Sequence, residues 1–161
     1  MKWNRKFVYP KSIRSTENGI RRYLIGEKKL PSVTSILDAT KSEEDKAALA
    51  NWVERTGLKE SEAIVKAASN RGSKMHAYLE SFLLGQQNLS FFDDNEQYKI
   101  MAKQIIEKGL INRFEEVWGV ECTLYKPDSY SGTCDAVGIY DGRESIIAVS
   151  YTHLRAHETI A

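Results

Sequence analysis

The chain has 161 residues, of which 42% are hydrophobic and 28% charged, and its formal net charge is +1. These values are typical of an ordinary globular domain and exclude disordered, collagen-like and coiled-coil classes. No stretch approaches the ~20 apolar residues of a membrane span, and the first residues match neither a secretory nor an organelle-targeting signal. Two cysteines are too few for a disulfide scaffold or a four-ligand zinc site. A reducing cytoplasm is therefore the expected location, with no membrane partner, and we expect a monomer.

Positive charge is concentrated at the N-terminus. Residues 1–30 carry a net charge of +7, which leaves −6 for residues 31–161. Aromatic residues alternate with these basic residues, a composition typical of surfaces that follow a phosphate backbone and stack on bases. We expect DNA contacts from this basic arm, in particular from Lys6, Tyr9, Arg21 and Arg22. The alternative is a solvated hairpin that packs its aromatic residues on the body of the protein.

The first half of the chain is predicted to be mainly helical after an N-terminal hairpin. The hairpin spans residues 5–25, with strands at Phe7–Tyr9 and Ile20–Ile25 and an Asn18-Gly19 turn. Ser32 is expected to cap a short helix after Pro31. Apolar periodicity and helix stops predict further helices over residues 42–55, 59–70, 72–84 and 96–112, with a loop over residues 86–95.

The second half changes to an alternating pattern of apolar and polar residues. Strands are predicted over residues 117–125 and 131–140, and a third from residue 144 to 149 after an Asp141-Gly142 turn. The chain shows no internal repeat. The predicted class is α+β (α/β), with helices first and then a β-meander in a single domain.

Two features of the sequence could bind a metal ion: the pair His76 and Glu80, and the isolated acid Asp135. His76 and Glu80 lie four residues apart, so they share one face of the helix predicted over residues 72–84, where they could hold a divalent cation. A surface histidine beside an ordinary helical acid has the same spacing. Asp135 lies in a strand of small and apolar residues, where a half-buried carboxylate needs a cation or donors. It could instead cap a turn before a strand that begins later.

A possible phosphate site follows residue 68. The segment Ser69–Ser73 is predicted as a loop leading into a helix N-terminus, where free amides, the helix dipole, Arg71 and Ser73 would favour a phosphate. A helix cap without any ligand would have the same sequence.

The order of these signals resembles a known nuclease family. The segments Leu30–Leu37 (LPSVTSIL), Ser69–His76 (SNRGSKMH) and Gly132–Asp135 (GTCD) resemble the RecB-like branch of the PD-(D/E)XK nucleases. More narrowly, they are similar to phage exonucleases related to the mitochondrial genome maintenance exonuclease. The resemblance covers residues 5–147, nearly the whole chain.

The resemblance implies a fold, a cofactor and a site. It implies a restriction-endonuclease-like mixed sheet flanked by helices, and hydrolysis of DNA phosphodiester bonds with Mg²⁺ or Mn²⁺. By position in the family motifs, His76 and Asp135 would bind the metal and Glu121 would be an accessory acid; the spacing on the helix adds Glu80. The implied substrate is DNA, single-stranded or at ends, in phage or bacterial replication, recombination or repair.

The chain departs from this family after its third predicted core strand. The family places an acid-x-Lys motif where this chain has Ala148-Val149-Ser150. Residues 148–161 resemble translated sequencing-adapter sequence, so we expect residues 1–147 to be an incomplete nuclease domain and the remainder a non-native tail. The expected function is a metal-dependent DNA exonuclease whose present copy is inactive. The alternative is a non-catalytic nucleic-acid-binding module.

Overall fold

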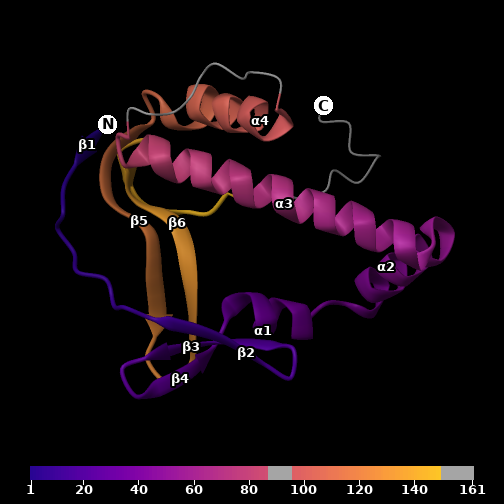
Figure 1. Ribbon diagram of the computed structural model, residues 1–161. Helices are drawn as coiled ribbons and strands as arrows, with labels where there is room; N and C mark the ends of the chain where they lie inside the picture. The colour runs from indigo at the N-terminus through magenta and orange to yellow at the C-terminus, as the bar shows by residue number, and fades with distance from the viewer. Residues whose placement is uncertain (87–95, 150–161) are drawn as a thin grey trace.

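The computed structural model describes residues 1–86 and 96–149, which form two β-sheets joined by helices (Figure 1). The larger sheet has the strand order β1-β5-β6-β7, and the smaller one has the order β2-β3-β4. The bounds of the larger sheet's strands are β1 (Lys2–Trp3), β5 (Phe114–Lys126), β6 (Tyr130–Tyr140) and β7 (Arg143–Ile147). Since β1 runs parallel to β5 and the other neighbours are antiparallel, the sheet is mixed. The predicted α+β class and the three C-terminal strands are confirmed.

The N-terminal hairpin forms with a different first strand from the predicted one. Asn18 and Gly19 turn with φ of 51° and 79°, as predicted. This two-residue turn pairs β3 (Ile20–Ile25) with β2 (Ile13–Glu17), because a tight turn sets the register on both sides. The predicted strand Phe7–Tyr9 is therefore wrong. A third strand, β4 (Lys28–Pro31), extends the hairpin into a sheet.

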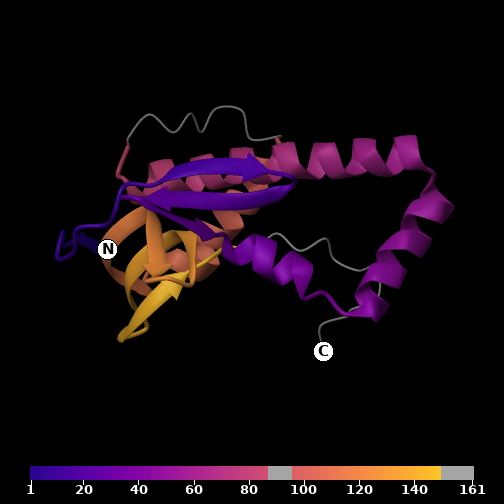
Figure 2. The same cartoon turned by 90° about the horizontal axis from the view of Figure 1, so that it is seen from below.

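The first two helices begin at serine caps. Ser32 accepts a hydrogen bond from Ser35 N at the start of α1 (Val33–Ala39), and Ser42 accepts one from Asp45 N at the start of α2 (Glu43–Thr56). Neither helix contains a buried residue. In Figure 2, α2 lies far from both sheets, at the outer end of the long helix that follows it.

The long helix α3 (Leu58–Leu83) replaces the two helices predicted over residues 59–70 and 72–84. Gly72 does not interrupt it, since a helical glycine costs only about 1 kcal/mol and the apolar stripe continues on both sides from Ala68 to Met75. The helix begins after Gly57, whose φ of 86° ends α2.

The core lies where α3 crosses β5 and β6 (Figure 1). Helix α4 (Gln97–Ile105) and the π-helical turn η1 (Ile106–Leu110) complete the described helices and pack against α3. Buried side chains from all these elements form one cluster, which includes Met75, Leu79, Leu83, Ala102, Ile106, Phe114, Val117 and Ala136. The described helices include none with the length and apolarity needed to cross a membrane.

The smaller sheet and α1 lie at the opposite end of β5 and β6 from α3 (Figure 1). Ser32 forms a bridge to Ser131 there, and both serines are almost completely buried. The predicted loop from residue 87 and the predicted tail from residue 150 lie outside the described residues.

Candidate metal centre and adjoining cavity

Three side chains from three different elements meet beside the core. His76 comes from α3, Glu121 from β5 and Asp135 from β6, and one ligand atom of each lies within 4.8 Å of the other two. His76 Nδ1 is 2.8 Å from Asp135 Oδ1. The buried neighbours Met75 and Leu79 anchor α3 on the sheet and thereby hold His76 at this position. The structure thus brings together the three residues that the family resemblance assigned to catalysis.

Glu121 occupies an unusual backbone conformation. Its φ is 50° in the middle of β5, between the cross-strand pairs Val120–Ala136 and Cys122–Cys134. A left-handed residue other than glycine within a strand costs about 1–3 kcal/mol and is found most often at functional sites. The register of the flanking pairs places Glu121 level with Asp135 on the neighbouring strand.

The charges of the three groups are strongly coupled. The hydrogen bond to Asp135 raises the pKa of His76 above its ordinary value, although burial opposes it. Burial raises the pKa of Asp135, but hydrogen bonds from His76 and from the Val149 N–H outweigh it, so that this pKa lies below 3.8. Burial raises the pKa of Glu121, and the nearby carboxylates of Asp135 and Glu80 raise it further. The acids therefore repel one another at a place where a cation would relieve the repulsion.

The donor set fits a hard divalent cation. Oxygen ligands bind Mg²⁺ at about 2.0–2.1 Å, so two ligand atoms of one ion lie at most about 4.2 Å apart. The ligand atoms of the three residues all lie within 4.8 Å of one another, so a small adjustment would let them share one ion. One imidazole nitrogen and two carboxylates suit Mn²⁺ or Mg²⁺ completed by water. Glu80, predicted from helical spacing as a ligand, is not in this group of three. It lines the cavity beside the group.

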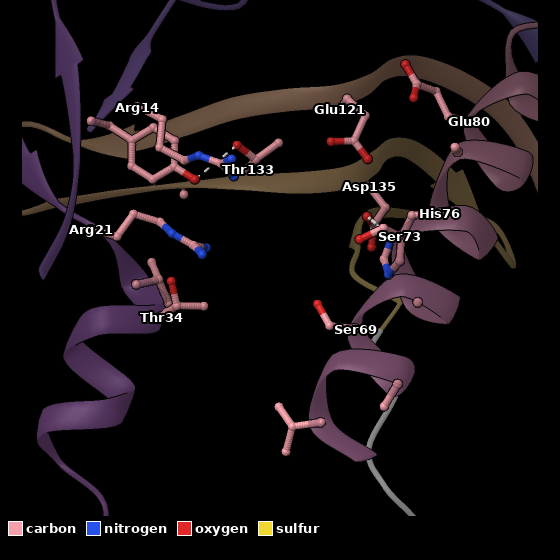
Figure 3. A pocket seen from close by; sticks show the side chains of 17 residues that line it. Arg14, Arg21, Thr34, Ser69, Ser73, His76, Glu80, Glu121, Thr133 and Asp135 are labelled. Carbon is pink, nitrogen blue, oxygen red and sulfur yellow. Dashed lines mark hydrogen bonds and ion pairs between the residues drawn. The ribbon is translucent and has the colours of Figure 1, made fainter. Parts of the chain in front are cut away.

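A cavity of about 890 Å³ opens beside the candidate metal centre (Figure 3). His76, Glu80, Glu121 and Asp135 lie on one side of it. Arg14 and Arg21 enter from the opposite side, on β2 and β3. Smaller polar side chains line the walls between them, including Ser69, Ser73, Thr34 and Thr133. An acidic end and a basic end thus face each other across one cavity.

The predicted phosphate site at residues 69–73 is wrong in its geometry. These residues lie in the middle of α3, so their backbone amides are within a helix and no N-terminus is present. Ser73 lines the cavity through its side chain. Arg71 lies in a different pocket, where its Nη1 donates to Gln97 Oε1 of α4 at 3.2 Å.

The four predicted DNA contacts of the arm do not form one surface. Arg21 lines the cavity, whereas Arg22 does not. Successive residues of a strand face opposite sides, so the two arginines cannot share a face of β3. Lys6 lies over the Trp118 ring at 4.7 Å, and Tyr9 packs against Gly119 and Cys122 with its hydroxyl buried. Neither Lys6 nor Tyr9 lines the cavity, which corrects the expected arrangement of the arm.

Arg14 was missed as a site residue. Its position follows from the register of the hairpin, in which Arg14 lies opposite Tyr23 and Thr16 opposite Arg21. Paired residues share a face, as do alternate residues of one strand, so Arg14 and Arg21 lie on the same face of the hairpin. The Asn18-Gly19 turn could have predicted this position, because it sets the register of the two strands beside it. The prediction placed the first strand at Phe7–Tyr9 instead, so Arg14 was not assigned to the hairpin face that carries Arg21.

The chain after β7 returns to the candidate metal centre. Ala136 pairs with Ile147, and continuing this register by one residue brings Ala148 level with Asp135. The Val149 N–H donates to Asp135 Oδ2 at 2.5 Å. Residues 148 and 149 therefore adjoin the carboxylates, and Ala148 offers no ligand atom.

Comparison with protein-family models, curated proteins and solved structures finds no match to this chain. The functional argument therefore depends on the geometry of the site.

Proposed function

We propose that this chain has the metal and DNA site of a PD-(D/E)XK-type exonuclease, with weakened or absent catalysis. A divalent cation binds at His76, Glu121 and Asp135, and a DNA strand lies in the adjoining cavity. The observation that carries the proposal is the convergence of these three ligands from α3, β5 and β6 at one end of a cavity with arginines at the other.

The chemistry of phosphodiester hydrolysis explains this choice. When bound, the divalent cation neutralises phosphate charge and lowers the pKa of a water molecule. In this chain Asp135 and Glu121 supply the carboxylates, and the hydrogen bond between Asp135 and His76 orients the imidazole.

Residues 148–150 are the reason for expecting weak catalysis. Ala148 lies level with Asp135 and provides no carboxylate. Neither Ala148 nor its two successors is a lysine that could orient the attacking water or stabilise developing charge. A second candidate, a nucleic-acid-binding module without hydrolysis, is favoured by the same observation.

Isothermal titration with Mn²⁺ tests the metal site. The wild-type chain should bind one ion, and Asp135→Asn should abolish the binding because it removes a charged ligand. Glu80→Gln is the matched control, since Glu80 borders the same cavity outside the group of three. Absence of Mn²⁺ binding in the wild type, or equal effects of the two variants, would overturn the assignment.

An incubation with labelled single-stranded DNA and Mg²⁺ or Mn²⁺ separates the two candidates. Binding without cleavage is expected from the chain as it stands. Metal-dependent cleavage that Asp135→Asn abolishes would show that the site needs neither a carboxylate nor a lysine at residues 148–150.

A further inference from the structure

Arg14 and Arg21 lie on one face of the hairpin, and the buried side chain of Tyr23 is on the same face. Arg14 lies directly opposite Tyr23 in the register, and Arg21 lies two residues before Tyr23 on the same strand. Tyr23 is only 6% exposed, while both arginines are exposed and border the cavity. Tyr23 is thus the buried neighbour of two exposed arginines, whose side chains lie on the same side of the cavity (Figure 3).

Neither guanidinium group has an ion pair or hydrogen bond with any residue in 1–86 or 96–149. By contrast, two lysines of the same sheet are paired, since Lys28 contacts Asp128 and Lys29 contacts Glu17. The acids that line the cavity are Glu80, Glu121 and Asp135, and all three lie across it from the arginines. Two like charges on one wall without a counter-charge indicate a place for an anionic ligand.

The arginine pair is held in a set position relative to the candidate metal centre. Thr133 Oγ1 donates a hydrogen bond to the Tyr23 hydroxyl at 3.4 Å. Thr133 and Asp135 lie two residues apart on β6. Strand β6 thus carries both Asp135 of the candidate metal centre and one of the contacts that join the arginine-bearing hairpin to the larger sheet.

We infer that Arg14 and Arg21 bind a second phosphate group of the DNA strand, distinct from the phosphate at the candidate metal centre. This inference rests on the proposed function, because it assumes a phosphate at His76, Glu121 and Asp135. Guanidinium groups bind phosphate oxygens through paired, charge-assisted hydrogen bonds, which suits this wall of the cavity. The site then selects ligands with at least two linked phosphates, and a mononucleotide occupies only the metal end.

Fluorescence anisotropy with a labelled oligothymidylate of twelve residues tests the inference in the presence of Mn²⁺. Arg14→Ala and Arg21→Ala should each weaken binding about tenfold, as expected for loss of a charged hydrogen bond. Each should also make binding less sensitive to salt. The negative slope of log K against log salt should decrease in magnitude by about 0.7, the value for one phosphate contact on a single strand. Arg22→Ala is the matched control, because it removes the same charge from the neighbouring position of β3, outside the cavity. Equal effects of Arg21→Ala and Arg22→Ala would overturn the inference.

Competition with thymidine 5′-monophosphate distinguishes the two phosphate positions. The arginine variants should leave its binding unchanged, whereas an equal loss would show that the arginines serve the metal-bound phosphate itself. Mn²⁺ titration of the wild-type chain distinguishes failure of this inference from failure of the proposed function. If the wild type binds Mn²⁺ but no oligonucleotide, the second phosphate site is overturned and the metal site is kept. If the wild type binds no Mn²⁺, the proposed function itself is overturned.

Discussion

His76 Nδ1 lies 2.8 Å from Asp135 Oδ1, and the Val149 N–H donates to Oδ2 of the same carboxylate. One side chain of β6 is thereby joined both to α3 and to the residues that follow β7. Without a metal, the positive partner of Asp135 is the imidazole. The protonation of His76 should therefore affect the stability of the metal-free protein.

The His76–Asp135 pair should stabilise the metal-free fold most in mildly acidic solution. The pKa of His76 is raised in the fold, so its contribution is fully present below the unfolded value of 6.5 and is lost as pH rises through the raised value. The pKa of Asp135 is lowered, so its contribution is present above the unfolded value of 3.8 and is lost as pH falls through the lowered value. The pair is thus fully effective between the unfolded pKa values of 3.8 and 6.5, and its contribution declines outside that range until the lowered pKa of Asp135 and the raised pKa of His76 are passed.

Thermal unfolding in EDTA measures this dependence. The melting temperature of His76→Gln should fall below that of the wild type by more at about pH 5.5 than at about pH 8.5. Glu80→Gln serves as a control, since Glu80 is not a partner of this hydrogen bond. A difference that is equal at both pH values, or larger in alkaline solution, would contradict the prediction.

Introducing the missing groups should create or increase cleavage. The variant Ala148→Asp with Ser150→Lys adds a carboxylate level with Asp135 and a lysine two residues further along the chain. Electrostatic stabilisation by one positioned group is worth about a hundredfold to a thousandfold in rate, so a gain of at least this size in Mg²⁺-dependent cleavage of single-stranded DNA is expected.

The same double substitution in an Asp135→Asn background is the control for this gain. Cleavage should disappear there, because the metal site has lost a ligand. A double variant that binds Mn²⁺ more tightly than the wild type yet cleaves no DNA would show that the residues at 148 and 150 do not complete a catalytic site.

Local patterns predicted most of the elements of this fold, and non-local pairing explains why β1 was not among them. The Asn18-Gly19 turn, the caps at Ser32 and Ser42 and the alternating C-terminal strands depend on residues close in sequence. The two-residue β1 was missed, since it pairs with β5 across more than a hundred residues and has no periodicity of its own.

The residues of the candidate site also differ in how far local sequence could predict them. His76, Glu121 and Asp135 were identified through the family resemblance, and their convergence depends on the packing of α3 on β5 and β6. Spacing alone suggested Glu80, because residues i and i+4 share a helix face, but a shared face does not show which of them meets the strands. The positive φ of Glu121 had no signal in the sequence, since glutamate rarely adopts it.

Two glycine substitutions test where α3 begins and whether it is continuous through residue 72. Gly72→Ala should raise the free energy of unfolding by about 0.5–1 kcal/mol, because alanine is the better helix former and its Cβ would meet no atom within 4 Å. Gly57→Ala should lower the free energy of unfolding by about 1–3 kcal/mol, since its φ of 86° and ψ of 144° strain any residue with a Cβ.

Urea unfolding of both variants provides the measurement. A helix that ended before residue 72, as the sequence pattern suggested, would give no gain with Gly72→Ala. Opposite signs for the two substitutions are the specific expectation, and destabilisation by both would contradict the continuous helix.

The hydrogen bond between Thr133 and Tyr23 should show an asymmetric response to mutation. Tyr23 is buried, whereas Thr133 is exposed. Thr133→Val leaves the Tyr23 hydroxyl buried without its donor, which should cost about 1–3 kcal/mol of unfolding free energy. Tyr23→Phe leaves only an exposed threonine hydroxyl that water can satisfy, so the cost should be nearer 0.5–1.5 kcal/mol.

A double-mutant cycle measured by urea unfolding decides whether this bond anchors the hairpin to β6. The double variant should be less destabilised than the sum of the single variants, because residues in direct contact are not additive. Both single variants should retain Mn²⁺ binding, since neither residue belongs to the metal group. Both should weaken oligonucleotide binding if this contact helps to fix the position of Arg14 and Arg21 relative to Asp135. Additive effects, together with unchanged oligonucleotide binding, would show that the smaller sheet keeps its place without the Thr133–Tyr23 bond.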